Sequence, residues 1–270
     1  MNSGFRHSHS LGQNFLTDGN LLSAIASDSG LTADSIAVEV GAGMGALTEK
    51  LAETGARIYA YEIDTRLKEY LRPLESKYPN LTVILGDFMK SELPFGRSYR
   101  AVANLPYYIT TPVLFRFLED EKCRSVTVMV QAEVAERIIA PPGGKDYGAL
   151  SVAAQLAGKA RITRRVGRHM FTPPPNVDSA VVHIEKTGEA ASDGVKRLVR
   201  AAFSMRRKTL VNCLTANGYG KAEVLSALAA EGLDPAVRGE RLSPDAFVRL
   251  AERLKNSAQT SDRYVKRISE

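Results

Sequence analysis

The chain has 270 residues, of which 44% are hydrophobic, and it carries a net charge of +6. This is enough for one large domain with a buried core and a second, smaller domain. The two Cys exclude a disulfide framework and a metal cluster, so we expect a protein without metal. No apolar run approaches the ~18 residues of a membrane helix, and the polar N-terminus lacks the apolar segment of a signal peptide. We therefore expect a cytoplasmic protein.

Strands and helices alternate after an irregular arm over residues 1–17 and a helix over 19–27. Short apolar runs predict strands over residues 36–40, 57–61, 81–85, 100–103 and 125–130. Helices are predicted from Ala46, from a cap at Thr65, from Thr110 or Thr111 with Pro112 as the first helical residue, and up to Ile139. This alternation indicates a Rossmann-like α/β fold, whose doubly wound, mainly parallel sheet binds ligands at the carboxyl ends of its strands.

The pattern changes after a loop at Pro141–Gly144. Two late strands are predicted over 161–166 and 177–184, followed by a polar connector. Beyond it the chain reads as a small all-helical domain, with helices over 195–204, 207–216, 221–231 and 244–255, the last one starting at Ser243-Pro244. We therefore divide the chain into residues 1–187, residues 188–256 and a polar tail over 257–270.

A glycine loop follows the first strand of the sheet. Gly41 and Gly43 allow a tight turn and the close approach of a ligand to the backbone. Glu62 ends the second strand, where its carboxylate can accept both ribose hydroxyls of an adenosine-containing cofactor. The spacing from Gly41 to Ala46 also satisfies the dinucleotide-binding pattern, so the glycines alone do not select the cofactor.

Three further features favour S-adenosylmethionine over a dinucleotide. Glu39 places an acid two residues before the first glycine. At the end of the third strand, Asp87 can accept a hydrogen bond from the adenine amino group and Phe88 can cover the face of the ring; a turn-forming role for Asp87 remains equally open. The third feature is the segment at the end of the fourth strand, which hydride transfer does not require.

That segment, Asn104-Leu105-Pro106-Tyr107, predicts methylation of an amino group on a planar base such as adenine, and by itself it would serve DNA as well as RNA. The lone pair of this amine is delocalised into the ring, so catalysis must draw it out of conjugation and aim it at the sulfonium methyl. The Asn104 side chain and the Leu105 carbonyl offer two acceptors for the amine hydrogens, and Pro106 stiffens the turn. Tyr107 can stack on the base, and positioning then supplies most of the rate.

Two apolar segments have alternative interpretations. Phe171 precedes a rigid Pro run and could cover the second face of the adenine, or it could be a core residue beneath a loop. In the N-terminal arm, Phe15 and Leu16 could dock the arm so that Asn14 reaches the cofactor, or they could form a hydrophobic staple onto the first helix.

Positive charge is concentrated between Lys159 and Lys208. Such a block is either a solvated face or a surface for a polyanion such as RNA. The candidate phosphate-binding residues are Arg161, Arg164, Arg165, Arg168, Arg206, Arg207 and Lys208. We expect the last three to start a helix of the second domain.

Together these motifs resemble the small-subunit ribosomal RNA adenine dimethyltransferases, the kasugamycin-susceptibility methyltransferase family. The resemblance covers about residues 8–255 and rests on the segments 11–16, 39–45, 61–64, 86–87, 104–107, 171–175 and 202–208. It implies a class I methyltransferase fold with S-adenosylmethionine as cofactor and S-adenosylhomocysteine as product. It further implies dimethylation of two adjacent adenosines in the 3′-terminal hairpin loop of 16S rRNA within an assembling small ribosomal subunit.

The resemblance also implies that the cofactor site includes Asn14, Leu16, Gly41, Glu62, Asp87 and Asn104. Many bacterial members carry Asn after the motif Tyr, whereas this chain has Tyr108, which we expect to alter the shape of the pocket without abolishing activity. Nothing in the sequence demands a dimer, and we expect a monomer. The alternatives are a large-subunit rRNA adenine methyltransferase of the antibiotic-resistance type, a non-catalytic RNA-binding assembly or transcription factor on the same fold, and, more distantly, an NAD-dependent oxidoreductase.

Overall fold

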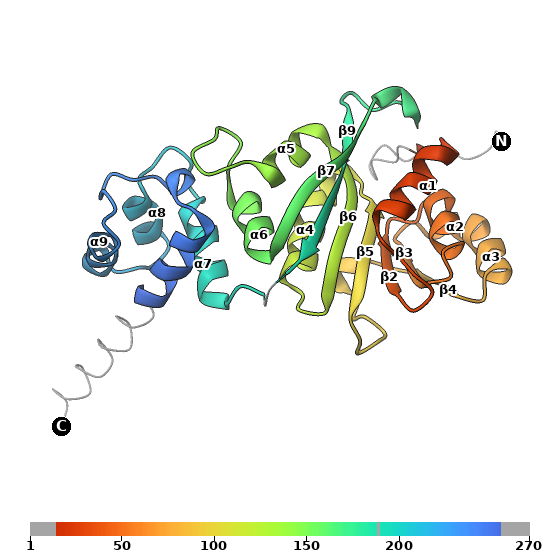
Figure 1. The fold of residues 1–270 in the computed structure, drawn as a ribbon, viewed down its shortest axis with the longest axis horizontal. Coiled ribbons are helices and arrows are strands. Elements are labelled where there is room, and N and C mark those ends of the chain that lie inside the picture. Colours follow the sequence, from red (N-terminus) through yellow and green to blue (C-terminus); the bar gives the residue numbers. More distant parts are fainter. Residues whose placement is uncertain (1–14, 188–189, 255–270) are drawn as a thin grey trace. The chain divides into compact units, whose positions relative to one another are not determined.

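The computed structural model describes residues 15–187 and 190–254 and divides into two compact units (Figure 1). Within the described residues, the first unit comprises residues 15–136 and 158–187, and the second comprises residues 137–157 and 190–254. The first unit is built on a sheet, and the second is helical. Residues 137–157 therefore lie with the C-terminal helices, although they precede the last two strands of the sheet.

The sheet of the first unit has seven strands in the order β4-β3-β2-β5-β6-β9-β7. Their bounds are β2 Ile36–Val40, β3 Arg57–Glu62, β4 Leu81–Leu85, β5 Tyr99–Asn104, β6 Cys123–Gln131, β7 Gly158–Val166 and β9 Ser179–Lys186. The first five strands in this order run parallel, and β9 is antiparallel to both β6 and β7. The predicted mainly parallel sheet is confirmed, with an antiparallel pair at one edge.

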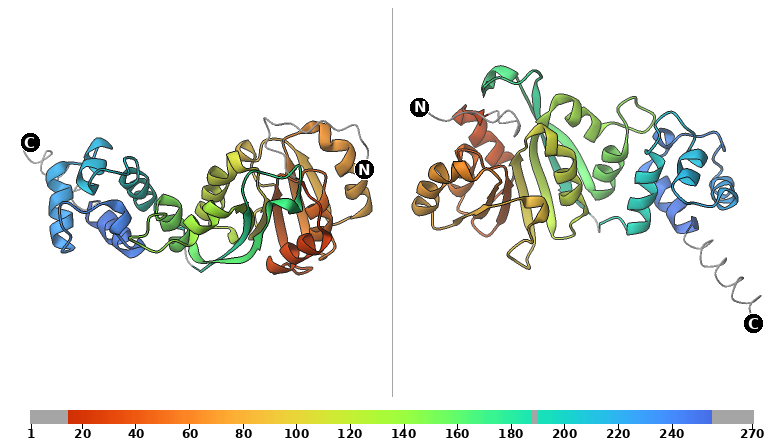
Figure 2. Two further views of the ribbon diagram at one scale, coloured as in Figure 1. Left: turned by 90° about the horizontal axis from the view of Figure 1, so that it is seen from above. Right: turned by 180° about the vertical axis from the view of Figure 1, so that it is seen from behind.

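Helices pack on both faces of this sheet (Figure 2). Helices α1 (Gly19–Asp28), α2 (Ala46–Ala52) and α3 (Lys68–Lys77) contribute apolar side chains to one core, together with strand residues such as Ile58 and Val102. On the opposite face, Phe117 of α4 (Thr110–Glu119) packs against Tyr99 and Phe88. Helix α5 (Ala132–Ile139) follows β6 directly. The doubly wound arrangement therefore buries the strands from both sides.

Two helix starts differ from the prediction. Asp64, not Thr65, caps the segment after β3: its side chain accepts a hydrogen bond from the backbone N–H of Arg66 at 3.1 Å, and a 3-10 turn, η2 (Thr65–Leu67), precedes α3. Helix α4 begins at Thr110 itself, because the 3-10 turn η4 (Tyr107–Ile109) leads into it without a side-chain cap. Pro112 is consequently the third helical residue.

A short two-stranded sheet ties the N-terminal segment to the Pro-rich segment. Strand β1 (Phe15–Leu16) pairs antiparallel with β8 (Phe171–Thr172), with Leu16 opposite Phe171. Phe15 and Leu16 therefore dock through backbone pairing, and both Leu16 and Phe171 also belong to the apolar core of this unit.

The second unit consists of α6 (Ala149–Ala157), α7 (Asp193–Ala202), α8 (Leu210–Ala216), α9 (Lys221–Ala230) and a helix over residues 244–254. Its core includes Val152, Leu198, Leu214 and Phe247. The predicted helical character is confirmed, and Ser243 accepts a hydrogen bond from the N–H of Ala246 at 3.2 Å, as expected of a cap. Helix α6 was not predicted.

Helix α8 starts later than predicted. Thr209 is its N-cap and accepts a hydrogen bond from the N–H of Asn212 at 3.3 Å, so Arg206, Arg207 and Lys208 lie in the turn before the helix and not at its start.

Candidate active site

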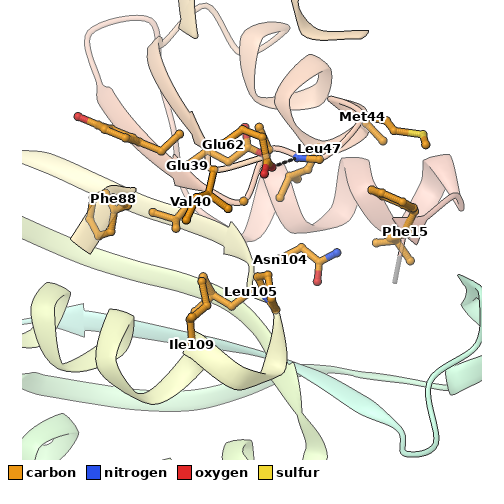
Figure 3. A pocket seen from close by; sticks show the side chains of 18 of the residues that line it. Phe15, Glu39, Val40, Met44, Leu47, Glu62, Phe88, Asn104, Leu105 and Ile109 are labelled. Carbon is orange, nitrogen blue, oxygen red and sulfur yellow. Dashed lines mark hydrogen bonds between the residues drawn. The ribbon is translucent and has the colours of Figure 1, made fainter. Parts of the chain in front are cut away.

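A pocket of about 530 Å³ opens at the carboxyl ends of β2, β3, β4 and β5 (Figure 3). Parallel strands end on the same edge of the sheet, so the loops that follow them converge there. The pocket brings together these predicted site residues: Leu16, Gly41, Gly43, Glu62, Asp87, Phe88, Asn104, Leu105, Pro106, Tyr107 and Phe171. Asn14 lies outside the described residues.

The glycine loop adopts the conformation for which glycine is suited. Gly41 has a φ of 79° and Gly43 a φ of 60°. A Cβ atom at Gly41 would lie 3.3 Å from Cδ of Pro106, and one at Gly43 would lie 3.2 Å from Cε1 of Phe15. A side chain in place of Gly41 or Gly43 would therefore fill the space between this loop, the Asn104 segment and the N-terminal strand. With glycine at both positions this space stays open, which supports the predicted close approach of a ligand to the backbone.

Glu62 is hydrogen-bonded to the glycine loop. Its Oε2 accepts a hydrogen bond from the N–H of Gly43 at 2.7 Å (Figure 3). Its Oε1 accepts one from the N–H of Asp64 at 2.8 Å. Burial raises the pKa of Glu62, while the two backbone hydrogen bonds act in the opposite direction. Each carboxylate oxygen keeps a further lone pair, so Glu62 can still accept hydroxyl donors from a ligand.

Glu39 is a second buried carboxyl group in the pocket. Its side chain is almost fully buried, and its Oε2 has no hydrogen-bond partner among the described residues. Burial raises its pKa to about 8; the nearby Thr48 hydroxyl opposes this rise and the charge of Glu62 adds to it. An unpaired buried oxygen is costly, so this end of the pocket favours a ligand that brings a hydrogen-bond donor or a positive charge.

Asp87 and Phe88 line the pocket at the end of β4. Asp87 caps the 3-10 turn η3 (Phe88–Lys90), because its Oδ1 accepts a hydrogen bond from the N–H of Met89 at 2.9 Å. The turn-forming role is therefore present, and it does not remove Asp87 from the pocket. The Phe88 ring packs against Tyr61, with a centroid separation of 5.2 Å, and the Arg116 guanidinium lies 4.1 Å from its centroid.

The Asn104 segment crosses the mouth of the pocket from the end of β5 (Figure 3). The carboxamide of Asn104 has no hydrogen-bond partner among the described residues. The backbone around it is fixed: the N–H of Leu105 donates to the Met129 carbonyl at 3.3 Å, and the Pro106 carbonyl accepts from the Thr110 hydroxyl at 3.1 Å. A rigid turn thus presents an uncommitted amide, which is the arrangement needed to accept hydrogen bonds from a substrate amine.

Aromatic side chains flank this turn. The Tyr107 hydroxyl lies 2.9 Å from the Ser179 hydroxyl of β9, which fixes the ring at the edge of the pocket. Phe171 is only 4% exposed and belongs to the core, yet it also lines the pocket. Phe171 is therefore a core residue, and its position in the pocket wall also leaves open the predicted contact with the second face of an adenine.

The basic residues separate into paired and unpaired groups. Arg164 forms a bidentate ion pair with Asp28, with both distances at 2.9 Å, and Arg165 pairs with Glu136 at 2.6 Å. In the second unit, Arg206 donates to the Lys145 carbonyl. The remaining candidates are exposed and make no ion pair among the described residues: Arg161, Arg168, Arg207 and Lys208.

Among the pocket residues that the sequence analysis did not single out, two are prominently exposed. Ile63 and Met89 are large apolar side chains that line the pocket and remain 49% and 40% exposed. Their positions in the sequence could have identified them as pocket residues, because each one follows shortly after an acidic residue at the end of a strand.

Within residues 15–187 and 190–254, no three His, Cys, Asp or Glu side chains come together as the ligands of a metal ion would. No helix in the same part of the chain has the length and apolar character needed to cross a membrane.

Comparison with known proteins adds a family and two close relatives. A family model described as ribosomal RNA adenine dimethylase matches residues 4–256. Ribosomal RNA small subunit methyltransferase A of Shouchella clausii (strain KSM-K16) is 43% identical over 276 residues, which cover 96% of this chain and 93% of that protein. The protein of the same name from Enterococcus faecalis (strain ATCC 700802 / V583) is 42% identical over 273 residues, which cover 94% of this chain and 92% of that protein.

Two solved structures share the architecture over most of the chain. A dimethyladenosine transferase from Plasmodium falciparum superposes with a TM-score of 0.75 at 27% identity, covering 87% of this chain and 95% of that one. The 23S rRNA methyltransferase ErmE superposes with a TM-score of 0.67 at 29% identity, covering 90% of this chain and all of that one. The Rossmann-like fold inferred from the sequence agrees with both.

Proposed function

The chain belongs to the ribosomal RNA adenine dimethylase family, and on this premise we propose that it dimethylates the N6 amino groups of two adjacent adenosines in the 3′-terminal hairpin loop of 16S rRNA. The observation that carries the proposal is the uncommitted carboxamide of Asn104, presented by a fixed turn at the mouth of the pocket. Relatives at 43% and 42% identity, whose names specify the small ribosomal subunit, support this choice of substrate.

In the proposed mechanism, the Asn104 side-chain oxygen and the Leu105 carbonyl accept the two hydrogens of the adenine amine during the first methyl transfer. The methylated nitrogen then loses one proton to solvent, and its remaining N–H is held by one of the two acceptors during the second transfer, after which this proton is also lost. This pair of acceptors favours a pyramidal nitrogen, whose lone pair then points at the methyl group. Tyr107, held by its contact with Ser179, stacks on one face of the base, and Phe171 borders the other. The target base must leave its stack to reach these groups, which a hairpin loop permits at low cost.

S-adenosylmethionine fits the rest of the pocket and supplies the methyl group when it is bound. We propose that Glu62 accepts the ribose hydroxyls, that Asp87 accepts from the adenine amine, and that Gly41 and Gly43 allow the cofactor to approach the backbone. The unpaired oxygen of Glu39 supports this assignment, because the cofactor brings a positive charge and amine hydrogens into the same pocket. Leu16 and Phe88 supply apolar walls.

We further propose that the rRNA backbone is bound by the exposed cations Arg161 and Arg168 of the first unit and Arg207 and Lys208 of the second. Phosphate contacts of this kind give affinity and orientation without reading the base sequence. Arg164 and Arg165 contribute less to such binding in this proposal, since their guanidinium groups are already paired with Asp28 and Glu136.

The likeness to ErmE keeps a second substrate open, namely adenine in the rRNA of the large subunit. The discriminating experiment is to incubate the purified protein with radiolabelled S-adenosylmethionine and with small or large subunits from a strain that lacks the modification. We expect label in the small subunit alone. Label confined to the large subunit would support the second substrate, and binding without label would support a non-catalytic RNA-binding protein.

A further inference from the structure

The two adjacent tyrosines after Pro106 differ in burial and in their contacts. They lie in the 3-10 turn η4, where consecutive side chains point about 120° apart. Tyr107 is half-buried and contacts Ser179 of β9. Tyr108 is 53% exposed and makes no hydrogen bond among the described residues.

The charges around the two phenol groups also differ. For Tyr107, burial raises the pKa, the contact with Ser179 lowers it, and the charge of Asp178 raises it. For Tyr108, burial raises the pKa first, and the charges of Glu62 and Asp87 add to the rise. Tyr108 lines the same pocket as Glu62 and Asp87, which end β3 and follow β4, whereas the Tyr107 hydroxyl contacts Ser179 of β9.

Tyr108 shares the pocket with two other exposed apolar residues. Ile63 and Met89 are the residues that follow closely after Glu62 and Asp87, and all three side chains line the pocket. Large apolar side chains that remain exposed together at the mouth of a pocket are typical of a ligand contact. We call these three residues, Ile63, Met89 and Tyr108, the donor rim.

We propose that the Tyr108 ring covers the adenosine end of the bound methyl donor, so that the donor rim controls how fast the donor and its product exchange with solvent. This inference rests on the proposed function, which places the adenosine at Glu62 and Asp87. Tyr107 and Phe171 border the target base instead, so the two ligands occupy different sides of the Asn104 turn. Dimethylation requires the product to leave and fresh donor to enter between methyl transfers, and a separate donor rim allows this while the RNA stays bound.

The test compares Tyr108→Ala, Tyr108→Phe and Tyr108→Asn in the full chain. Calorimetry measures the affinity for S-adenosylhomocysteine, and stopped-flow mixing measures its rate of release. Loss of the ring in Tyr108→Ala should weaken product affinity about tenfold, mainly through faster release, whereas Tyr108→Phe keeps the ring and should stay within about twofold. Tyr108→Asn, which replaces the ring with a small polar side chain, should resemble Tyr108→Ala. Binding to the small subunit should be the same for all three variants.

Tyr107→Phe is the matched control, because it removes the contact with Ser179 and leaves the donor rim unchanged. It should alter turnover without altering product affinity. Unchanged product affinity and release in Tyr108→Ala would overturn the inference, and so would a loss of subunit binding with donor affinity intact, since the ring would then face the RNA. If the parent protein binds neither donor nor product, the proposed function itself is wrong, and that outcome is distinct from any effect of Tyr108.

Discussion

Asn104 combines two properties that rarely coexist at the rim of a pocket, a fixed backbone and an uncommitted side-chain amide. Replacement by Ala removes the acceptor and leaves the turn intact. We expect Asn104→Ala to lower the rate of methyl transfer by about 10²–10³-fold, the usual effect of losing one preorganised polar contact in a transition state. Donor affinity, measured by calorimetry, should change little. Turnover close to that of the parent would rule out the proposed role of Asn104.

Glu39 makes the stability of the protein depend on pH. Its pKa is about 8 in the folded chain and about 4.5 when unfolded, so the folded state binds the proton more tightly. The free energy of unfolding should therefore decrease as the pH rises through this window, by at most on the order of 5 kcal/mol. Glu39→Gln cannot ionise and should lack this decrease. Denaturant unfolding of both proteins at pH 5, 7 and 9 would measure this difference. If the free energy of unfolding changed with pH in the same way in both proteins, the prediction would be wrong.

Residues at strand ends were the easiest to predict from the sequence. Gly41, Glu62, Asp87 and Asn104 each follow an apolar run, and parallel topology brings such positions to one edge of the sheet. Ile63 and Met89 were missed because an apolar residue after a strand is indistinguishable from a core residue until its exposure is known. Arg164 was predicted to bind phosphate, and the sequence could not indicate that it pairs with Asp28.

At the scale of elements, the loop between β2 and α2 offers a controlled test. Gly43 and Gly30 have nearly the same φ, 60° and 63°, but a Cβ at Gly43 would press on Phe15 whereas a Cβ at Gly30 meets nothing within 4 Å. Both Ala substitutions should cost about 1 kcal/mol of stability because of the left-handed backbone. Only Gly43→Ala should also weaken donor binding, because only this substitution displaces Phe15 in the wall of the pocket. Calorimetry would measure the donor affinity of both variants. Equal donor affinity in both variants would contradict the assigned role of the loop.

The strands were predicted within one or two residues at most boundaries, because most of them are apolar runs between turn residues; the basic strand β7 starts three residues earlier than predicted. Helix starts were less accurate where several polar residues compete as caps, as with Asp64 and Thr65 or with Thr209 after Lys208. Helix α6 was missed because it is apolar almost throughout, and a helix buried on several sides lacks the polar face that marks a surface helix.

For the molecule as a whole, the sequence indicated a sheet domain followed by a helical one. It did not indicate that residues 137–157 would leave the sheet, enter the helical unit and return as β7. That excursion depends on tertiary packing: Ala140, Tyr147 and Val152 are buried in the same core as Leu198 and Phe247. Periodicity within a short window carries no information on which distant core a segment joins.

The basic turn of the second unit should contribute to binding the ribosomal particle. Arg207 and Lys208 are exposed, and charge reversal in Arg207→Glu/Lys208→Glu should weaken binding and reduce the slope of log affinity against log salt by about two. Lys221→Glu, at the start of α9, reverses one charge elsewhere in the same unit and should change the slope less than the double variant does. Binding titrations over a range of salt concentrations would measure both effects. An unchanged slope in the double variant would identify the turn as a solvated face.

The most direct test of the account is to identify the modified nucleosides in particles treated with the purified protein and S-adenosylmethionine. Small subunits lacking the modification should gain two methyl groups on N6 of each of two adjacent adenosines in the 3′-terminal hairpin loop, as read by mass spectrometry of the isolated fragment. Over the same short reaction time, particles treated with Asn104→Ala should gain about 10²–10³-fold fewer methyl groups. Methylation at any other base, or in the large subunit alone, would contradict the account.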